Sequence, residues 1–329
     1  MSVNEALAAL RQEEETVEIA QAALADRVAE WRADPCVASV FEAMDRFGKG
    51  AALDLCPALA DLFAAETPQA RRFAEVFVSA GLDGLRAHPL GQMPLSHGRR
   101  NAVPVLVLAS SGRASLALAA YEGAALAALP APRTARFSPQ ETWIHVLSGT
   151  GTADLILRRD GPDDREVLQS GAVELRPGTA FYRYGPRQAL QVRSVQGSLV
   201  LLRLQRAFAD TEPAREFSLP DGTLVHQAAA QPHDTRLELA VSVLARMGRK
   251  DAVGAMAAIA SGDTFKDASQ SLRWQALREV LALDTAAGLD LLARLSADPE
   301  DPLSHPVASL HASLLDTWPD LERTSPWSE

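Results

Sequence analysis

Apolar residues recur every three or four positions in the first part of the chain, which is typical of amphipathic helices. Between residues 4 and 31 these positions are Leu7, Leu10, Val17, Ala20, Leu24 and Val28. A second run covers roughly residues 36–63. A third begins at Pro68, with Thr67 as its expected N-cap and with Gly81 and Gly84 as its expected end. The pattern predicts a helical region over residues 1–90.

The pattern changes near His88, where short runs of alternating or β-branched residues begin. The runs are separated by turn signals at Ser110–Gly112, Gly149–Gly151, Asp160–Asp164, Pro177–Gly178, Gly185–Pro186 and Gln196–Gly197. Evenly spaced short strands indicate an antiparallel sandwich or barrel. We therefore predict a β-barrel over residues 91–210, and an α+β fold for the chain as a whole.

After about Asp210 the helical period returns and two similar stretches follow each other. RLELAVSVLARMGRKDAVGAMAAIAS and SLRWQALREVLALDTAAGLDLLARLSA each predict two helices, joined at Gly248–Lys250 and at Asp284–Thr285. Their offset of roughly 35 residues lies in the range of helical-hairpin repeats. Residues 211–329 therefore resemble HEAT-like repeats, although an ordinary helical bundle explains the same periodicity equally well.

Composition and charge narrow the classes of function. The 329 residues are 47% hydrophobic and 22% charged, which is globular, and arginine in excess of lysine indicates a bacterial source. The net charge of −10 argues against nucleic-acid binding, which needs a positive face. The acidic beginning MSVNEALAALRQEEE is unlike a signal peptide, and no apolar window is long enough for a membrane span. With only Cys36 and Cys56, we expect a cytoplasmic protein.

Two stretches of the central region resemble the signature motifs of the cupin superfamily. ETWIHVLSGTGTADLIL resembles the hairpin of the first motif, with Gly149 at the glycine that ends it. LQSGAVELRPGTAFYRY resembles the second, with Gly171 at its opening and Pro177–Gly178 at its turn. The resemblance covers roughly residues 100–206. It implies a cupin barrel (a double-stranded β-helix) and, since cupins commonly associate through their sheets, a possible homodimer.

The positions that hold the metal in cupins carry other residues in this chain. The resemblance places Arg136 and Ser138 at the histidine pair, Thr142 at the glutamate and Phe181 at the third histidine. A first-row metal needs imidazole or carboxylate ligands, which a guanidinium and a phenyl ring do not replace. We therefore expect a cupin fold without its usual metal and without a cofactor.

Arginine and tyrosine gather in the same region and suggest a different ligand. The candidate ligand-binding residues are Arg136, Glu141, His145, Tyr182, Tyr184 and Arg187. Guanidinium and phenol groups suit a carboxylate, a phosphate or a peptide. The same side chains also fit a solvated outer barrel wall. Glu141 and His145 share one strand face, which leaves three interpretations open: half of a relocated metal site, a polar residue on the outer sheet face, or a hydrogen-bonded core histidine.

Two functions follow from these features. The first is a non-catalytic cupin-like binding or scaffold protein that recognises a small anionic ligand or a peptide or protein partner. The alternative is an enzyme on a cupin scaffold, either an oxygenase with relocated metal ligands or a metal-free isomerase. The enzyme would use His145, Glu141 and a barrel tyrosine, and it requires these side chains to meet in one cavity.

Overall fold

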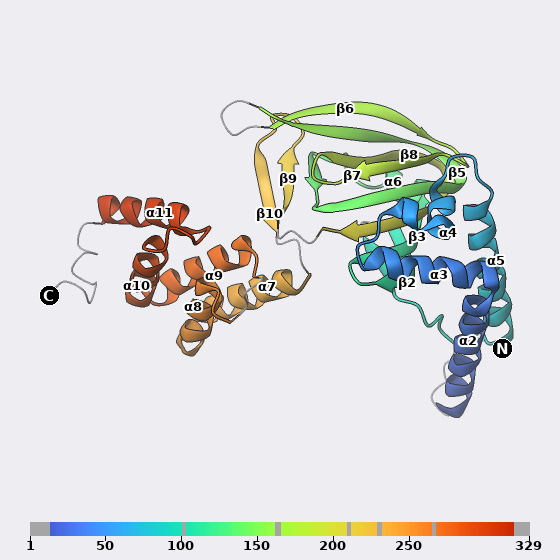
Figure 1. Cartoon of the computed structure of the whole chain (residues 1–329), viewed down its shortest axis with the longest axis horizontal. Helices are drawn as coiled ribbons and strands as arrows, with labels where there is room; N and C mark the ends of the chain where they lie inside the picture. The colour runs from blue at the N-terminus through green and yellow to red at the C-terminus, as the bar shows by residue number, and fades with distance from the viewer. Residues whose placement is uncertain are drawn as a thin grey trace. The chain divides into compact units, whose positions relative to one another are not determined.

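The computed structural model describes residues 14–100, 103–161, 166–208, 212–228, 232–264 and 268–318. The fold is α+β, and its sheets are antiparallel (Figure 1). The chain divides into two compact units. Unit 1 comprises Met1–Pro132, Gln140–Arg159 and Val167–Phe208, and unit 2 comprises Arg133–Pro139, Asp160–Glu166 and Ala209–Glu329. The division at residues 90 and 210 stays a prediction.

Most helices of unit 1 precede its sheet in the chain. They are α2 (Glu14–Ala33), α3 (Pro35–Gly48), η1 (Leu53–Leu55), α4 (Pro57–Ala60), η2 (Asp61–Phe63), α5 (Gln69–Ala87) and, between two strands, α6 (Gly123–Ala127). The Asp34 side chain determines where α3 begins. Its Oδ1 accepts hydrogen bonds from the backbone N–H groups of Cys36 and Val37, at 2.9 and 3.4 Å.

Helix α5 differs from the prediction at both ends. Its N-cap position is Pro68, while the Thr67 hydroxyl accepts only a 3.3 Å hydrogen bond from the N–H of Gln69. The expected stop at Gly81 and Gly84 is wrong, because the helix continues to Ala87. A Cβ atom at Gly84 would lie 2.8 Å from Leu24 Cδ2 on α2. Gly84 therefore permits close helix packing rather than ending the helix.

Unit 1 contains a large sheet. Its strands are β1 (His97–Arg100), β2 (Val103–Ser111), β3 (Ala114–Glu122), β5 (Gln140–Asp160), β6 (Glu166–Leu175), β7 (Ala180–Tyr184) and β8 (Gln188–Ala207). The strand order is β1-β2-β3-β8-β5-β6, and β7 also pairs with β5. Within the described strands this path is open, from β1 to β6, so the predicted closed barrel is not confirmed.

Strands β5 and β8 run side by side over most of their length, and two predicted turns fall inside them (Figure 1). The turns expected at Gly149–Gly151 and Gln196–Gly197 are therefore wrong. The register shifts between Val146 and Thr150, which marks β-bulges. Gly149 has φ +83°, and a Cβ atom there would lie 2.0 Å from the carbonyl oxygen of Ser198. Glycine is required at this position by a bulge, not by a hairpin turn.

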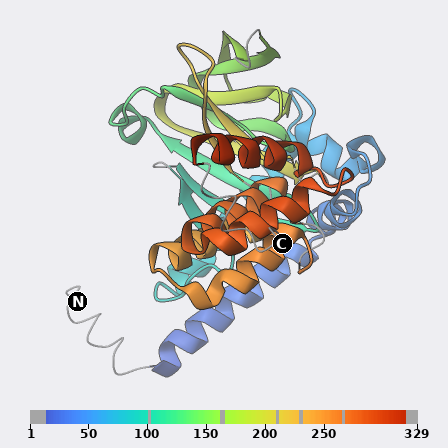
Figure 2. The same ribbon diagram turned by 90° about the vertical axis from the view of Figure 1, so that its left-hand side faces the viewer.

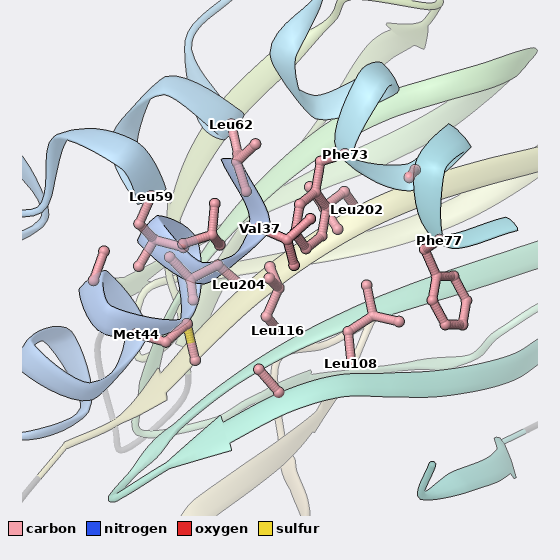
Figure 3. Close-up of a cluster of buried hydrophobic side chains, with 14 of the residues drawn as sticks. Val37, Met44, Leu59, Leu62, Phe73, Phe77, Leu108, Leu116, Leu202 and Leu204 are labelled. Atoms are coloured by element: carbon pink, nitrogen blue, oxygen red, sulfur yellow. The ribbon is translucent and has the colours of Figure 1, made fainter. Parts of the chain in front are cut away.

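Successive side chains of β5 alternate between two faces of the sheet. One face, here called the helix-covered face, carries Trp143 and Leu147, which pack on the helices. Figure 3 shows this core, in which side chains of the helices pack against side chains of the strands. The labelled residues are Val37, Met44, Leu59, Leu62, Phe73, Phe77, Leu108, Leu116, Leu202 and Leu204. The other face, here called the inner face, carries a separate apolar cluster that includes Ile144, Val146 and Leu201.

Unit 2 combines a small sheet with helices. Its strands β4 (Thr134–Phe137), β9 (Ala214–Ser218) and β10 (Leu224–Ala228) pair in the order β10-β9-β4. The helices are α7 (Pro232–Arg246), η3 (Lys250–Ala252), α8 (Val253–Ser261), α9 (Gln270–Leu283), α10 (Thr285–Ser296) and α11 (Ser304–Thr317). Helices α7 to α11 lie against one another around one apolar core (Figures 1 and 2, orange to red). The HEAT-like assignment stays a prediction.

Among the described residues, no helix combines the length and the apolar character needed to span a membrane.

Candidate anion-binding site

Glu141 lies on the helix-covered face and is engaged by Arg206 of the neighbouring strand β8. Arg206 Nε donates a 2.5 Å hydrogen bond to Glu141 Oε1, and the two side chains are only 16% and 14% exposed. Arg206 Nη1 also donates to the carbonyl oxygens of Phe47 and Ala51, at 3.1 and 2.6 Å. The guanidinium lies 4.0 Å from the centre of the Phe47 ring. Arg206 therefore links the end of α3 to the sheet, and Glu141 balances its charge.

Tyr182 and Tyr184 lie on β7, on the same face as Glu141 and opposite β5. The Tyr182 hydroxyl is hydrogen-bonded to Glu141, and its pKa is raised first by burial and then by the Glu141 charge. The Tyr184 ring lies 5.4 Å from the Phe208 ring. Both tyrosines remain more than 40% exposed. They form the rim of the helix-covered face.

His145 shares that face but is buried beneath the helices, with only 2% of its surface exposed. Burial lowers the pKa of its imidazole, while a hydrogen bond to the Leu62 backbone and the charge of Glu66 partly oppose this effect. Its Nδ1 atom is buried without a hydrogen-bond partner. A neutral ring enclosed in this way lacks the access to solvent and ligand that a general base needs.

The remaining two predicted residues lie elsewhere. Arg187 is exposed in the turn between β7 and β8, where its N–H donates to the Tyr184 carbonyl at 3.1 Å. Arg136 is exposed on β4 in unit 2, opposite Glu216. Of the six candidates, the structure thus brings Glu141 into contact with Tyr182 and places His145 and Tyr184 on the same face.

The inner face carries a polar cluster that the sequence analysis missed, here called the inner-face cluster: Tyr121, Thr142, Arg183, Arg203 and Gln205. Thr142 on β5 lies opposite Arg183 on β7 and opposite Gln205 on β8. Arg203 lies two residues before Gln205, on the same face of β8. The sequence contains one signal for this cluster. Side chains alternate along β7, so Arg183 points to the face opposite to Tyr182 and Tyr184.

Arg183 is the central cation of this cluster. Its Nη1 donates to the Gln188 carbonyl at 2.7 Å, and its Nη2 donates to Thr142 Oγ1 at 3.3 Å. Its Nε is buried without a hydrogen-bond partner, and Arg183 forms no ion pair with any residue that the structure describes. Burial, followed by the charge of Arg203, lowers the pKa of Arg183 to about 10. It therefore remains charged at neutral pH.

Tyr121 and Thr142 complete the cluster. Burial raises the pKa of Tyr121, while the charges of Arg203 and Arg183 act in the opposite direction. Its hydroxyl therefore stays protonated near pH 7 and can donate a hydrogen bond. The Thr142 hydroxyl is almost fully buried and accepts from Arg183, with the Gln205 amide 3.5 Å away. The cluster thus presents hydrogen-bond donors and positive charge to an apolar surrounding.

A metal of the cupin type does not fit the residues at the corresponding positions. The Thr142 hydroxyl is bonded to a guanidinium, which would repel a metal cation. Phe181 belongs to the apolar cluster of the inner face, and Arg136 is itself a cation. In the described part of the chain, no three His, Cys, Asp or Glu side chains gather in a group that could hold a metal ion.

Comparison with known proteins gives limited similarity. No protein-family model matches the sequence, and neither does any curated protein. Similar solved structures include a cupin superfamily protein from Desulfitobacterium hafniense, with 14% identity over 34% of this chain and 83% of that chain, at a TM-score of 0.23.

Two further similar structures are vicilin from Corylus avellana (hazelnut) and an oxalate decarboxylase. Vicilin has 12% identity over 38% of this chain and 33% of that chain, at a TM-score of 0.26. The oxalate decarboxylase has 15% identity over 38% of this chain and 30% of that chain, at a TM-score of 0.25. Because these TM-scores are so low, we transfer no property of these proteins to this chain.

Proposed function

We propose that this chain is a non-catalytic binding protein that recognises a small anion at the inner-face cluster, on an open cupin-like sheet. The observation that carries the proposal is Arg183, a largely buried cation with a buried, unbonded Nε and no carboxylate partner among the described residues. Burying a charge without an opposite charge costs free energy, and so does leaving a buried donor unbonded. A bound anion would offset both costs.

The chemistry of the cluster favours a carboxylate or a phosphate. A guanidinium offers a planar fork of N–H donors that matches two oxygens of either group. Arg203 adds a second positive charge, and Tyr121 supplies a neutral donor. Ile144, Val146 and Leu201 line the same face, so the bound group would be small and partly desolvated, which strengthens its electrostatic attraction.

The catalytic alternative has no comparable support. Glu141 is held by Arg206, and His145 is enclosed beneath η2 with its pKa lowered. We therefore assign these two residues to the stability of the helix-covered face rather than to a reaction.

Thermal unfolding with added anions tests the proposal. Phosphate and succinate are compared with chloride at equal ionic strength, in the wild type and in Arg183→Met. We expect at least one of the two anions to raise the Tm of the wild type by a few degrees more than chloride does, because a ligand that binds only the folded state stabilises it. Arg183→Met is expected to lose this increase.

Arg193→Gln is the matched control. Arg193 is a β8 arginine that is already paired with Asp154 at 2.9 Å and is 37% exposed. The control should retain the anion-dependent increase in Tm. An equal response to the anions in Arg183→Met and in the wild type, or no specific response in the wild type, would overturn the proposal.

A further inference from the structure

A concave site lies entirely within unit 2, among α9, α10 and α11. It is a groove with a volume of about 810 Å³. Its walls are mostly apolar. Two tryptophans and four leucines make up most of the lining: Trp274, Leu281, Leu289, Leu310, Leu314 and Trp318. Trp318 is 57% exposed, which is unusual for the largest apolar side chain. Volume and lining both fall in the range of sites that bind small molecules.

The groove contains one cation. Arg278 lies one helical turn after Trp274 on α9, so both side chains reach the same wall. Arg278 is exposed, and within the described ranges it takes part in no hydrogen bond or ion pair. The hydroxyl of Thr285, the other polar side chain of the lining, already donates to the Leu281 carbonyl at 3.3 Å. Arg278 is therefore the group available to a charged ligand.

The size of the groove distinguishes a small molecule from a protein partner. Nine residues line it. A stable protein interface uses about 20–30 residues on each side, which is far more than this groove offers. An elongated apolar body inside the groove would cover the exposed Trp318 and the buried or partly buried leucines that line it, while an acidic end would meet Arg278.

We propose that this groove binds an amphiphilic carboxylate, a straight apolar chain that ends in one carboxyl group. The apolar chain lies between the two tryptophans and the leucines of α10 and α11. The carboxylate pairs with the Arg278 guanidinium at the rim. This site is separate from the inner-face cluster and does not depend on it.

Calorimetric titration of the full chain with dodecanoate, below its micelle concentration, tests the proposal. Dodecanol is the matched ligand, since it has the same apolar chain without the charge. We expect dodecanoate to bind once per chain and about fivefold more tightly than dodecanol, which is the upper range for an exposed ion pair. Arg278→Gln should bind both ligands with equal affinity.

Two further variants complete the test. Arg236→Gln removes an exposed arginine of α7 outside the groove and should keep the preference for the acid. Leu314→Glu places a negative charge in the groove wall and should abolish binding of dodecanoate, with circular dichroism to verify its helices. The proposal is overturned if the wild type does not bind dodecanoate, or if Arg278→Gln keeps the full preference for it.

Discussion

Burial lowers the pKa of two basic side chains in unit 1, with different consequences for their charge at pH 7. Arg183 has such a high intrinsic pKa that a decrease to about 10 leaves it charged. The pKa of His145 begins at 6.5 and falls, so the ring is neutral at pH 7. Both shifts arise mainly from desolvation, which disfavours the charged form. Arg183 thus keeps the charge that our proposed anion site requires, whereas His145 is a neutral part of the core.

The lowered pKa of His145 predicts that stability depends on pH. The unfolded chain binds the proton more tightly, since its imidazole keeps a pKa near 6.5. The contribution of His145 is therefore complete above about pH 6.5 and is lost as pH falls toward the lower folded value. Urea unfolding at about pH 7.5 and pH 5 measures this loss.

His145→Gln should lose less stability than the wild type between these two pH values, because the glutamine does not titrate. His97→Gln, which changes an exposed histidine of the same unit, should behave like the wild type. If His145→Gln and the wild type show the same dependence on pH, the ring titrates normally in the folded state and our description of it is wrong.

The Glu141–Arg206 ion pair leads to a second prediction at this scale. Glu141→Gln leaves the Arg206 guanidinium largely buried without its counter-charge, so the free energy of unfolding should decrease by about 3 kcal/mol. The double variant Glu141→Gln/Arg206→Met removes the charge as well and should recover part of the loss. A change below about 0.5 kcal/mol in Glu141→Gln, measured by urea unfolding, would show that the ion pair does not stabilise the fold.

At the scale of elements, glycine is where sequence and structure differ most. The local sequence predicts a turn at Gly149 and a helix end at Gly84, since glycine is common at both. In the structure Gly149 forms a bulge opposite β8, and Gly84 lies against Leu24 of α2. Each role depends on a neighbouring segment that is distant in sequence. Local periodicity predicts the alternation within β5. It does not predict which distant segment packs against a glycine.

The bulge can be tested directly with two glycines of the same sheet. Gly149→Ala should lower the free energy of unfolding by at least about 2 kcal/mol, because of its positive φ and the 2.0 Å approach to the Ser198 carbonyl. Gly171→Ala on β6 has open space around the new methyl group and should stay within about 0.5 kcal/mol of the wild type. Equal unfolding midpoints for the two variants would contradict the role of Gly149.

At the scale of the whole molecule, the sequence predicted the α+β class, while the inner-face cluster depends on long-range pairing. Thr142 meets Arg183 across 41 residues of sequence and Gln205 across 63. None of these residues forms a motif by itself, and the net charge of −10 hides two neighbouring arginines. Alternation along β7 places Tyr182 and Tyr184 on the opposite face from Arg183, and Glu141 on the neighbouring strand β5 lies on the face of the tyrosines.

The measurement that tests the central claim most directly is calorimetric titration of the full chain with phosphate and with succinate. The account predicts that at least one of them binds the wild type and Arg193→Gln once per chain. Its affinity should fall at least about tenfold in Arg183→Met, as expected for lost hydrogen bonds to a charged group. Binding of equal strength in Arg183→Met, or no binding of either anion to the wild type, would contradict an anion site at the inner-face cluster.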